Sequence, residues 1–159
     1  MKKHLVGDWM TSDVISLSPK ASLVDVKRLM SSKRIRRLPV MDKGKLAGIV
    51  TLGDVREASP SDATSLSIYE LNYLLARLTI DQFMTRSVIT VTPFTEIYSA
   101  AELMLDHKLG GLPVVANGKL VGIITESDIF RVLVTEARSE MSADGATRIP
   151  AALLVPAAG

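Results

Sequence analysis

The sequence predicts an α/β (α+β) fold built from two tandem, pseudo-symmetric copies of one β-α-β-β-α unit. The first observation behind this prediction is an internal repeat. The chain aligns with itself without a gap at an offset of 74 residues, which places Met10 on Met84 and Asp54 on Asp128. The second observation is that short β-branched runs alternate with helical patterns inside each copy. With 159 residues, 47% of them apolar, the chain can bury a core of its own.

Each copy begins with a short β-branched run, residues 14–17 in the first copy and 88–91 in the second, and both runs predict a strand. A proline follows each run. Apolar residues then recur at helical spacing over 23–30 and 97–104, which predicts one helix in each copy.

A hairpin and a second helix complete each unit. The turn glycines Gly44 and Gly118 favour tight hairpin turns, because glycine tolerates positive φ. A helix is expected to begin directly after Thr51 and again after Thr125. The predicted hairpin strands are 38–41 with 46–50 in the first copy, and 112–115 with 120–124 in the second.

One such unit would leave a large apolar face exposed to water. Two units related by an approximate two-fold axis would cover that face, sheet against sheet. The duplication is therefore a requirement for burial, and the two units are expected to form one module.

The expected organisation is a first motif over residues 6–58, a linker over 59–79, a second motif over 80–138, and a flexible tail over 139–159. The linker contains an amphipathic helical pattern. Its apolar stripe could pack on its own module or contact a second subunit, and the tail could instead dock on a partner. The apolar positions of the linker stripe are Ile68, Leu71, Leu74, Leu75 and Leu78.

Composition excludes several classes of function. The chain has no cysteine, which removes disulfides and thiolate metal sites. Its formal net charge of +2 gives little drive toward nucleic acid or a membrane. No apolar run approaches the ~18 residues of a spanning helix, and no signal peptide is recognisable. We therefore expect a cytoplasmic protein without a membrane partner. Nucleophile–base pairs and metal-ligand sets are also missing, so no catalytic function is expected.

The most informative strings are residues 48–54 and 122–128, which read Gly-x-x-Thr-x-x-Asp in both copies. A strand ends, a hydroxyl follows, and a carboxylate lies three residues further on. One interpretation is a helix N-cap, with the threonine and aspartate satisfying free amides. The other is a ligand site, because a helix N-terminus suits a phosphate and a nearby carboxylate can accept hydrogen bonds from a ribose.

This ordered set, with Leu-Pro-Val and a turn glycine before each string, resembles the cystathionine-β-synthase (CBS) motif pair, or Bateman module. The resemblance covers roughly residues 6–136. It extends to stand-alone bacterial or archaeal CBS-domain proteins and proteins of the acetoin-utilisation type. It implies up to two clefts between the motifs that take AMP, ADP, ATP or another adenosyl compound such as S-adenosylmethionine or NAD.

The resemblance also implies roles for individual residues. Asp54 and Asp128 would hold the ribose hydroxyls, and Thr51 and Thr125 would contact phosphate or ribose. The positions implied next to the ligand or its adenine are Ser18, Thr92, Leu23, Ile35, Ile97 and Leu109.

The two copies differ in charge before the Leu-Pro-Val strand. Residues 33–37 carry four cations, whereas the matching residues 107–111 end in two glycines. Arg36 and Arg37 are the candidates for phosphate contacts, because guanidinium pairs bidentately with phosphate oxygens. Gly110 would let a ligand or backbone approach closely. The alternative is a solvated basic loop.

These observations predict a regulatory, energy-sensing module that requires no cofactor and takes an adenine nucleotide as its regulatory ligand. A homodimer and a regulated enzyme or transporter are the expected protein partners. Two alternatives stay open. The chain could be an interaction or scaffold protein with vestigial nucleotide sites, or residues 33–37 could bind nucleic acid, which the balanced charge disfavours.

Overall fold

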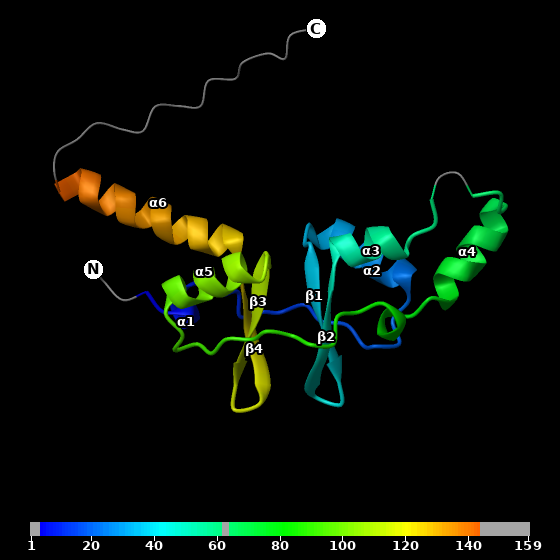
Figure 1. The fold of residues 1–159 in the computed structure, drawn as a ribbon, viewed down its shortest axis with the longest axis horizontal. Coiled ribbons are helices and arrows are strands. Elements are labelled where there is room, and N and C mark those ends of the chain that lie inside the picture. Colours follow the sequence, from blue (N-terminus) through cyan, green and yellow to red (C-terminus); the bar gives the residue numbers. More distant parts are fainter. Residues whose placement is uncertain (1–3, 62–63, 144–159) are drawn as a thin grey trace, which may run out of the picture.

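The computed structural model describes residues 4–61 and 64–143, and of Ala143 only the backbone. Two similar halves lie side by side, each with one β-hairpin and its own helices (Figure 1). In chain order the elements are α1 (Val6–Trp9), α2 (Leu23–Lys33), β1 (Arg37–Asp42), β2 (Lys45–Thr51), α3 (Leu52–Ala58), α4 (Ile68–Arg77), η1 (Ile80–Gln82), α5 (Ile97–Asp106), β3 (Gly111–Ala116), β4 (Lys119–Thr125) and α6 (Glu126–Ala143).

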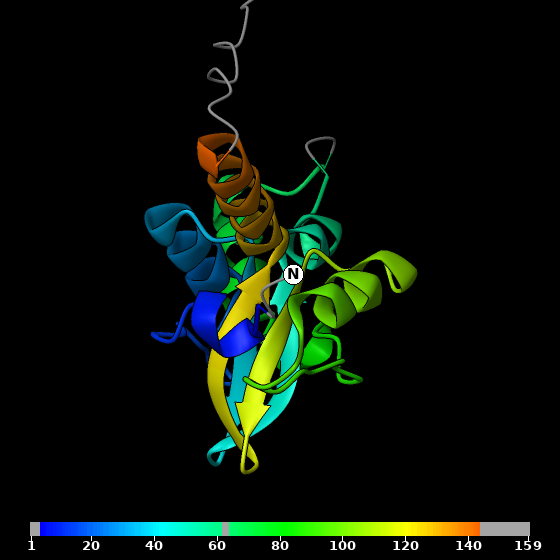
Figure 2. The same ribbon diagram turned by 90° about the vertical axis from the view of Figure 1, so that its left-hand side faces the viewer.

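The two hairpins confirm the predicted repeat in detail. Strand β1 pairs antiparallel with β2, and β3 pairs with β4 in the equivalent register, each with an irregularity at the same relative position. Gly44 and Gly118 adopt φ values of 77° and 73° in the turns, a conformation that glycine reaches without strain. Strands β2 and β4 contact each other, and both hairpins project from the same side of the molecule (Figures 1 and 2).

The predicted first strand of each unit is much shorter than expected. Within 14–17 and 88–91 the structure has a single parallel bridge each, Leu17 to Val40 and Val91 to Val114. Leu17 donates to the Pro39 carbonyl at 3.1 Å and accepts from Met41 at 2.8 Å. Pairing stops there because a proline follows two residues later and ends any ladder. The rest of each segment contributes to the clefts described below.

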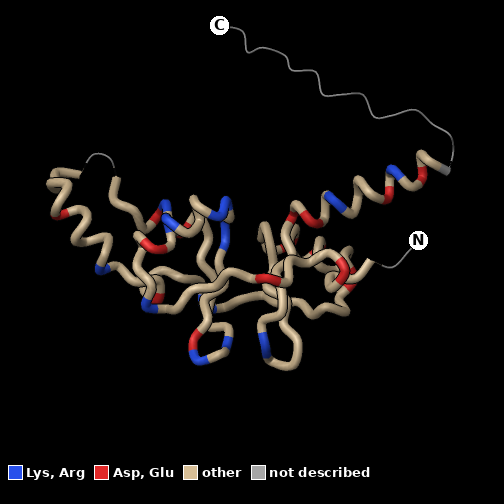
Figure 3. The backbone as a smooth tube through the Cα atoms, turned by 180° about the vertical axis from the view of Figure 1, so that it is seen from behind, with Lys and Arg blue, Asp and Glu red and all other residues tan. Residues whose placement is uncertain are grey.

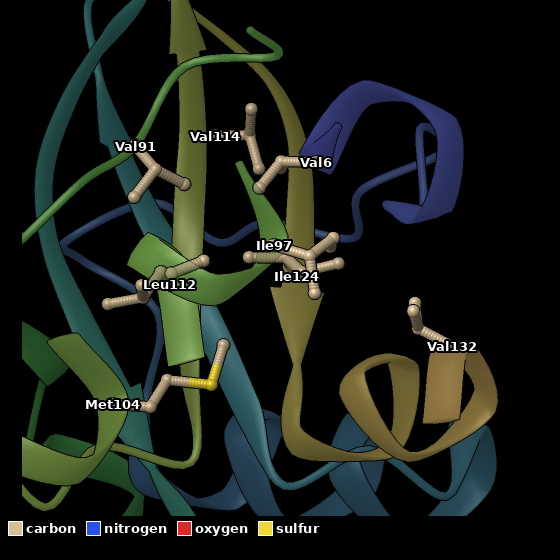
Figure 4. Close-up of a cluster of buried hydrophobic side chains, with 9 residues drawn as sticks. Val6, Val91, Ile97, Met104, Leu112, Val114, Ile124 and Val132 are labelled. Carbon is tan, nitrogen blue, oxygen red and sulfur yellow. The ribbon is translucent and has the colours of Figure 1, made fainter. Parts of the chain in front are cut away.

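The two halves exchange their leading segments. Helix α1 precedes the first unit, yet Val6 is fully buried in the core of the second half (Figure 4). The amide of Val6 donates to the Thr95 carbonyl at 2.9 Å, and Gly7 donates to the Pro93 carbonyl at 2.8 Å. The other members of this buried cluster all come from the second half: Val91, Ile97, Ala100, Met104, Leu112, Val114, Ile124 and Val132.

The leading segment of the second unit packs in the core of the first half in the same way. Ile80 and Met84 are buried among side chains of the first half, whose core is built on Leu23, Leu38 and Val50. Backbone pairing follows the same rule. The isolated bridges that join a leading segment to the other half link Leu5 to Glu96, Thr11 to Ile123 and Ile49 to Thr85. Each half therefore needs the other half's leading segment to close its core.

Helix α4 confirms the predicted amphipathic helix of the linker. Its end packs on the first half through Leu75 and Leu78, as the first of the two alternatives expected. Its beginning is open: the exposed fractions of Ile68 and Tyr69 are 64% and 84%. Helix α6 runs to Ala143, into the segment expected to be a tail, and residues 144–159 lie outside the described part of the chain.

Among residues 4–61 and 64–143, no helix combines the length and apolar character needed to cross a bilayer.

Candidate functional site

Two clefts lie between the halves at equivalent places. The first cleft, of about 740 Å³, includes Thr51 and Asp54. The second cleft, of about 500 Å³, includes Thr125 and Asp128. The two linings largely correspond residue by residue through the internal repeat. Each cleft draws residues from both halves, because the loop before β3 reaches the first cleft and the loop before β1 reaches the second.

The first cleft contains a capping box at the start of α3. Asp54 Oδ2 accepts from the backbone N–H of Thr51 at 2.7 Å and from its Oγ1 at 2.8 Å, and the Asp54 amide donates back to Oγ1 at 3.3 Å. The helix-cap interpretation of this string is therefore correct. Within the described part of the chain, the second oxygen, Oδ1, accepts no hydrogen bond, so it can accept one from a ligand.

The second cleft repeats the arrangement with one addition. Asp128 Oδ2 accepts from the Thr125 backbone and from Thr125 Oγ1, both at 2.8 Å. Asp128 Oδ1 forms an ion pair with Arg131 Nη1 at 2.9 Å. Asp128 is only 2% exposed, whereas the Arg131 side chain is 67% exposed and is free to move away. A ligand that uses this carboxylate must share Oδ1 with Arg131 or displace Arg131.

Arg37 stands between the clefts and lines both of them. Its Nη1 donates to the Gly110 carbonyl at 2.6 Å. A Cβ at Gly110 would collide with the Arg37 guanidinium, and a Cβ at Gly111 would lie 2.9 Å from Arg37 Cδ. The two glycines thus form a notch that admits the arginine. Burial lowers the pKa of Arg37, while Glu126 acts in the opposite direction and Arg36 adds to the lowering.

The cations of the first cleft are Arg36, Arg37, Arg56 and Lys108, and its single carboxylate is Asp54. The side chains of Arg36, Arg56 and Lys108 form no ion pair or hydrogen bond with any residue that the structure describes. Figure 3 shows basic positions around the start of β1 on one half and acidic positions at the start of α6 on the other. Unpaired guanidinium and ammonium groups in a cleft attract anions.

The structure brings most of the predicted site residues to the clefts. Arg36, Arg37 and Gly110 line both clefts. The first cleft adds Thr51, Asp54 and Leu109, and the second adds Ile35, Thr125 and Asp128.

Four predicted residues lie elsewhere. Leu23 and Ile97 are the first residues of α2 and α5 and are buried in the two cores. Ser18 and Thr92 are exposed in the turns before those helices and line neither cleft. Helical spacing marks a residue as buried, but it does not distinguish a core position from the wall of a cleft.

Several cleft residues were not foreseen as site residues. Two of them are indicated weakly by features of the sequence. Arg131 follows Asp128 by three residues, one helical turn away, and Lys108 matches Arg34 through the repeat. The additional charged cleft residues are Asp13, Arg34, Arg56, Lys108, Glu126 and Arg131. No group of three or more histidine, aspartate or glutamate side chains in residues 4–61 and 64–143 could hold a metal ion.

The family model of the CBS domain matches residues 6–61 and residues 80–135. The chain belongs to the CBS domain family. Among curated relatives, protein MJ1225 of Methanocaldococcus jannaschii is 34% identical over 132 residues, which cover 82% of this chain and 47% of MJ1225. A 33.4 kDa protein of Thermofilum pendens is 36% identical over 157 residues, which cover 90% of this chain and 48% of that protein. The chain thus spans about half the length of these relatives.

Solved CBS pairs match the whole module. The CBS domain pair of protein MJ0100, in complex with 5′-methylthioadenosine and S-adenosyl-L-methionine, superposes with a TM-score of 0.71 at 28% identity, covering 85% of this chain and 99% of that one. AcuB of Vibrio cholerae, assigned to acetoin utilization, superposes with a TM-score of 0.70 at 33% identity, covering 90% of this chain and 98% of AcuB. CBSX2 of Arabidopsis thaliana, in complex with AMP, superposes with a TM-score of 0.69 at 32% identity, covering 85% of this chain and 99% of CBSX2. These likenesses confirm the mixed helix-and-strand CBS-pair fold with two small antiparallel sheets.

Proposed function

We propose that this CBS pair is a non-catalytic regulatory module that binds adenosyl ligands, adenine nucleotides among them, in the two clefts between its halves. The observation that carries the proposal is the twice-repeated Thr–Asp pair at a helix start, in clefts that both contain the cations Arg36 and Arg37. We expect the protein to act in the cytoplasm on a regulated enzyme or transporter.

The carboxylate geometry supports a ribose contact. Asp54 fixes the start of α3 with Oδ2, and its Oδ1 accepts no hydrogen bond from the described residues. A ribose hydroxyl can donate to that oxygen without disturbing the cap. A hydrogen bond to a charged acceptor contributes about 1.5–3 kcal/mol, which is more than a neutral one contributes.

The cations support a phosphate contact. Arg36, Arg56 and Lys108 line the first cleft without a carboxylate partner among the described residues. An anion there would meet guanidinium groups able to bind two phosphate oxygens at once. The solved neighbours agree in ligand class, since CBSX2 was solved with AMP and MJ0100 with 5′-methylthioadenosine and S-adenosyl-L-methionine.

Regulation follows from the position of the clefts. Each cleft is lined by both halves, so a ligand bridges them and stabilises the arrangement in which the bridging contacts fit. A ligand shifts a conformational equilibrium only through its differential affinity for the two states. A target protein that recognises one arrangement would respond to the ligand concentration.

Isothermal titration calorimetry against AMP, ADP, ATP, S-adenosylmethionine and NAD tests the proposal. We expect saturable binding of at least one of these ligands and an increase in melting temperature on binding. GTP at the same concentration serves as the control for the adenine requirement. Failure of all five ligands to bind would reject the proposal and favour an interaction protein with vestigial sites.

We further propose that the module forms a homodimer through α4. Ile68, Tyr69, Tyr73 and Leu74 leave an apolar surface exposed along this helix, and a two-fold interface is the common way for identical chains to cover such a surface. Light scattering should then give about twice the 17.2 kDa chain mass at ~50 µM. Leu74→Glu should shift the mass toward the monomer, whereas Leu105→Glu, at an exposed leucine of α5, should not. A monomeric wild type would reject the dimer.

A further inference from the structure

The two clefts differ in charge although their Thr–Asp pairs are alike. Arg36 and Arg37 are common to both clefts, so the difference lies in the other residues. The first cleft alone has two cations, Arg56 and Lys108, and one carboxylate, Asp54. The residues that line only the second cleft include two cations and three carboxylates: Arg34, Arg131, Asp13, Glu126 and Asp128.

Pairing between these groups increases the difference. In the second cleft Arg131 is bound to Asp128 at 2.9 Å, and the shared Arg37 is held at the Gly110 carbonyl, where Glu126 acts on it. In the first cleft, Arg56 and Lys108 have no such partner within the described residues. The repeat shows where the difference arises, because the apolar Leu52 of the first half occupies the position of Glu126.

A phosphate would therefore meet different surroundings in the two clefts. In the first, unpaired cations attract it. In the second, the carboxylates of Asp13 and Glu126 repel it, and like charges placed against a ligand are an effective way to reject it. An adenosyl compound without phosphate has no such penalty. A positively charged 5′ substituent is favoured there.

We infer that the two clefts take adenosyl ligands of different charge: a phosphorylated nucleotide in the Asp54 cleft, and an unphosphorylated adenosyl compound, neutral or cationic at its 5′ substituent, in the Asp128 cleft. This inference rests on the proposed function and makes it more specific. The module would then respond to the concentrations of two classes of metabolite, one in each cleft, and would not bind the same nucleotide in both. Because Arg36 and Arg37 serve both clefts, a nucleotide bound to them in the first cleft leaves the second cleft with Arg34 and with Arg131, which is paired to Asp128.

Calorimetry on the full chain with AMP, 5′-methylthioadenosine and S-adenosylmethionine tests the inference. Two double variants, Arg56→Gln with Lys108→Gln and Asp13→Asn with Glu126→Gln, change charges that belong to one cleft only. They leave both Thr–Asp pairs intact. The wild type should bind one AMP per chain and should still bind 5′-methylthioadenosine when saturated with AMP.

The first double variant should weaken AMP by at least about tenfold, a change of about 1.4 kcal/mol, and should leave 5′-methylthioadenosine within about twofold. The second should weaken S-adenosylmethionine and allow a second AMP to bind. Two equal AMP sites in the wild type would overturn the inference. So would competition between AMP and 5′-methylthioadenosine for one site, or AMP binding with no binding of either unphosphorylated ligand. The proposed function fails as well only if ADP, ATP and NAD also do not bind, and this outcome distinguishes the two failures.

Discussion

Replacing Asp54 by asparagine separates the two roles assigned to this carboxylate. As a cap, Asp54 accepts two hydrogen bonds from Thr51 through Oδ2, at 2.7 and 2.8 Å. The asparagine oxygen can accept the same bonds, so the main loss is one negative charge at the start of α3. That loss should cost about 0.5–1 kcal/mol of stability, or a decrease in melting temperature of about 1–4 °C.

The effect on binding should be larger. In the variant, the position of Oδ1 is taken by an NH₂ group, which donates and cannot accept from a ribose hydroxyl. The complex loses a charge-assisted hydrogen bond worth about 1.5–3 kcal/mol. Since each 1.4 kcal/mol is a factor of ten, the AMP dissociation constant should rise by about 10- to 150-fold.

Asp25→Asn is the matched control. Asp25 forms the same capping box with Ser22, at 3.0 and 2.8 Å, and lines neither cleft. The two variants should lose similar stability in thermal denaturation, but only Asp54→Asn should lose AMP affinity in calorimetry. If Asp54→Asn keeps the wild-type dissociation constant within about twofold and melts like the control, Asp54 is a cap alone.

Three further predictions address packing, pH and charge. Gly48→Ala should lower the free energy of unfolding by about 1–3 kcal/mol in chemical denaturation, because the new Cβ would lie 2.8 Å from the carbonyl oxygen of Thr85. Gly53→Ala, whose Cβ meets nothing closer than 3.5 Å, should stabilise α3 by up to about 1 kcal/mol. Equal stabilities of the Gly48→Ala and Gly53→Ala variants would argue against the close approach of Gly48 to Thr85. The hydrogen bonds from Ser22 lower the pKa of Asp25, so its stabilisation is complete above the ordinary pKa of about 4 and is lost as the pH falls through the lowered value. Asp25→Asn should therefore approach wild-type stability in acid, and an unchanged difference down to that range would be inconsistent with this assignment. Arg36→Gln with Arg37→Gln should weaken ATP far more than adenosine, most clearly at low salt. Equal losses for both ligands would mean that these arginines do not contact phosphate.

The hairpins and helix starts were predictable because their signals are local. Gly44 and Gly118 adopt positive φ in their turns, and the capping box of Thr51 and Asp54 is made by residues only three positions apart. The repeat then indicated two similar halves. The position of Asp54 at the first cleft followed from the same string.

The exchange of leading segments could not be predicted in this way. The apolar character of Val6 and Ile80 shows that they are buried, but not which half buries them. The same ambiguity affected Leu23 and Ile97, which are core residues and do not line the clefts. The charge difference between the clefts depends in part on Asp13 and Lys108, each of which lies in the opposite copy of the repeat from the Thr–Asp pair of its cleft and meets that pair only in the folded structure.

Amide chemical shifts of the isotope-labelled protein titrated with AMP test the central claim most directly. The account predicts saturable changes at Gly53, Asp54 and Gly110, which come from both halves and meet only at the first cleft. It predicts no comparable change at Asp25, in the matching capping box outside the clefts. Shift changes confined to one half, or no change at ~1 mM AMP, a concentration at which even a weak site with a millimolar dissociation constant is half-filled, would contradict it.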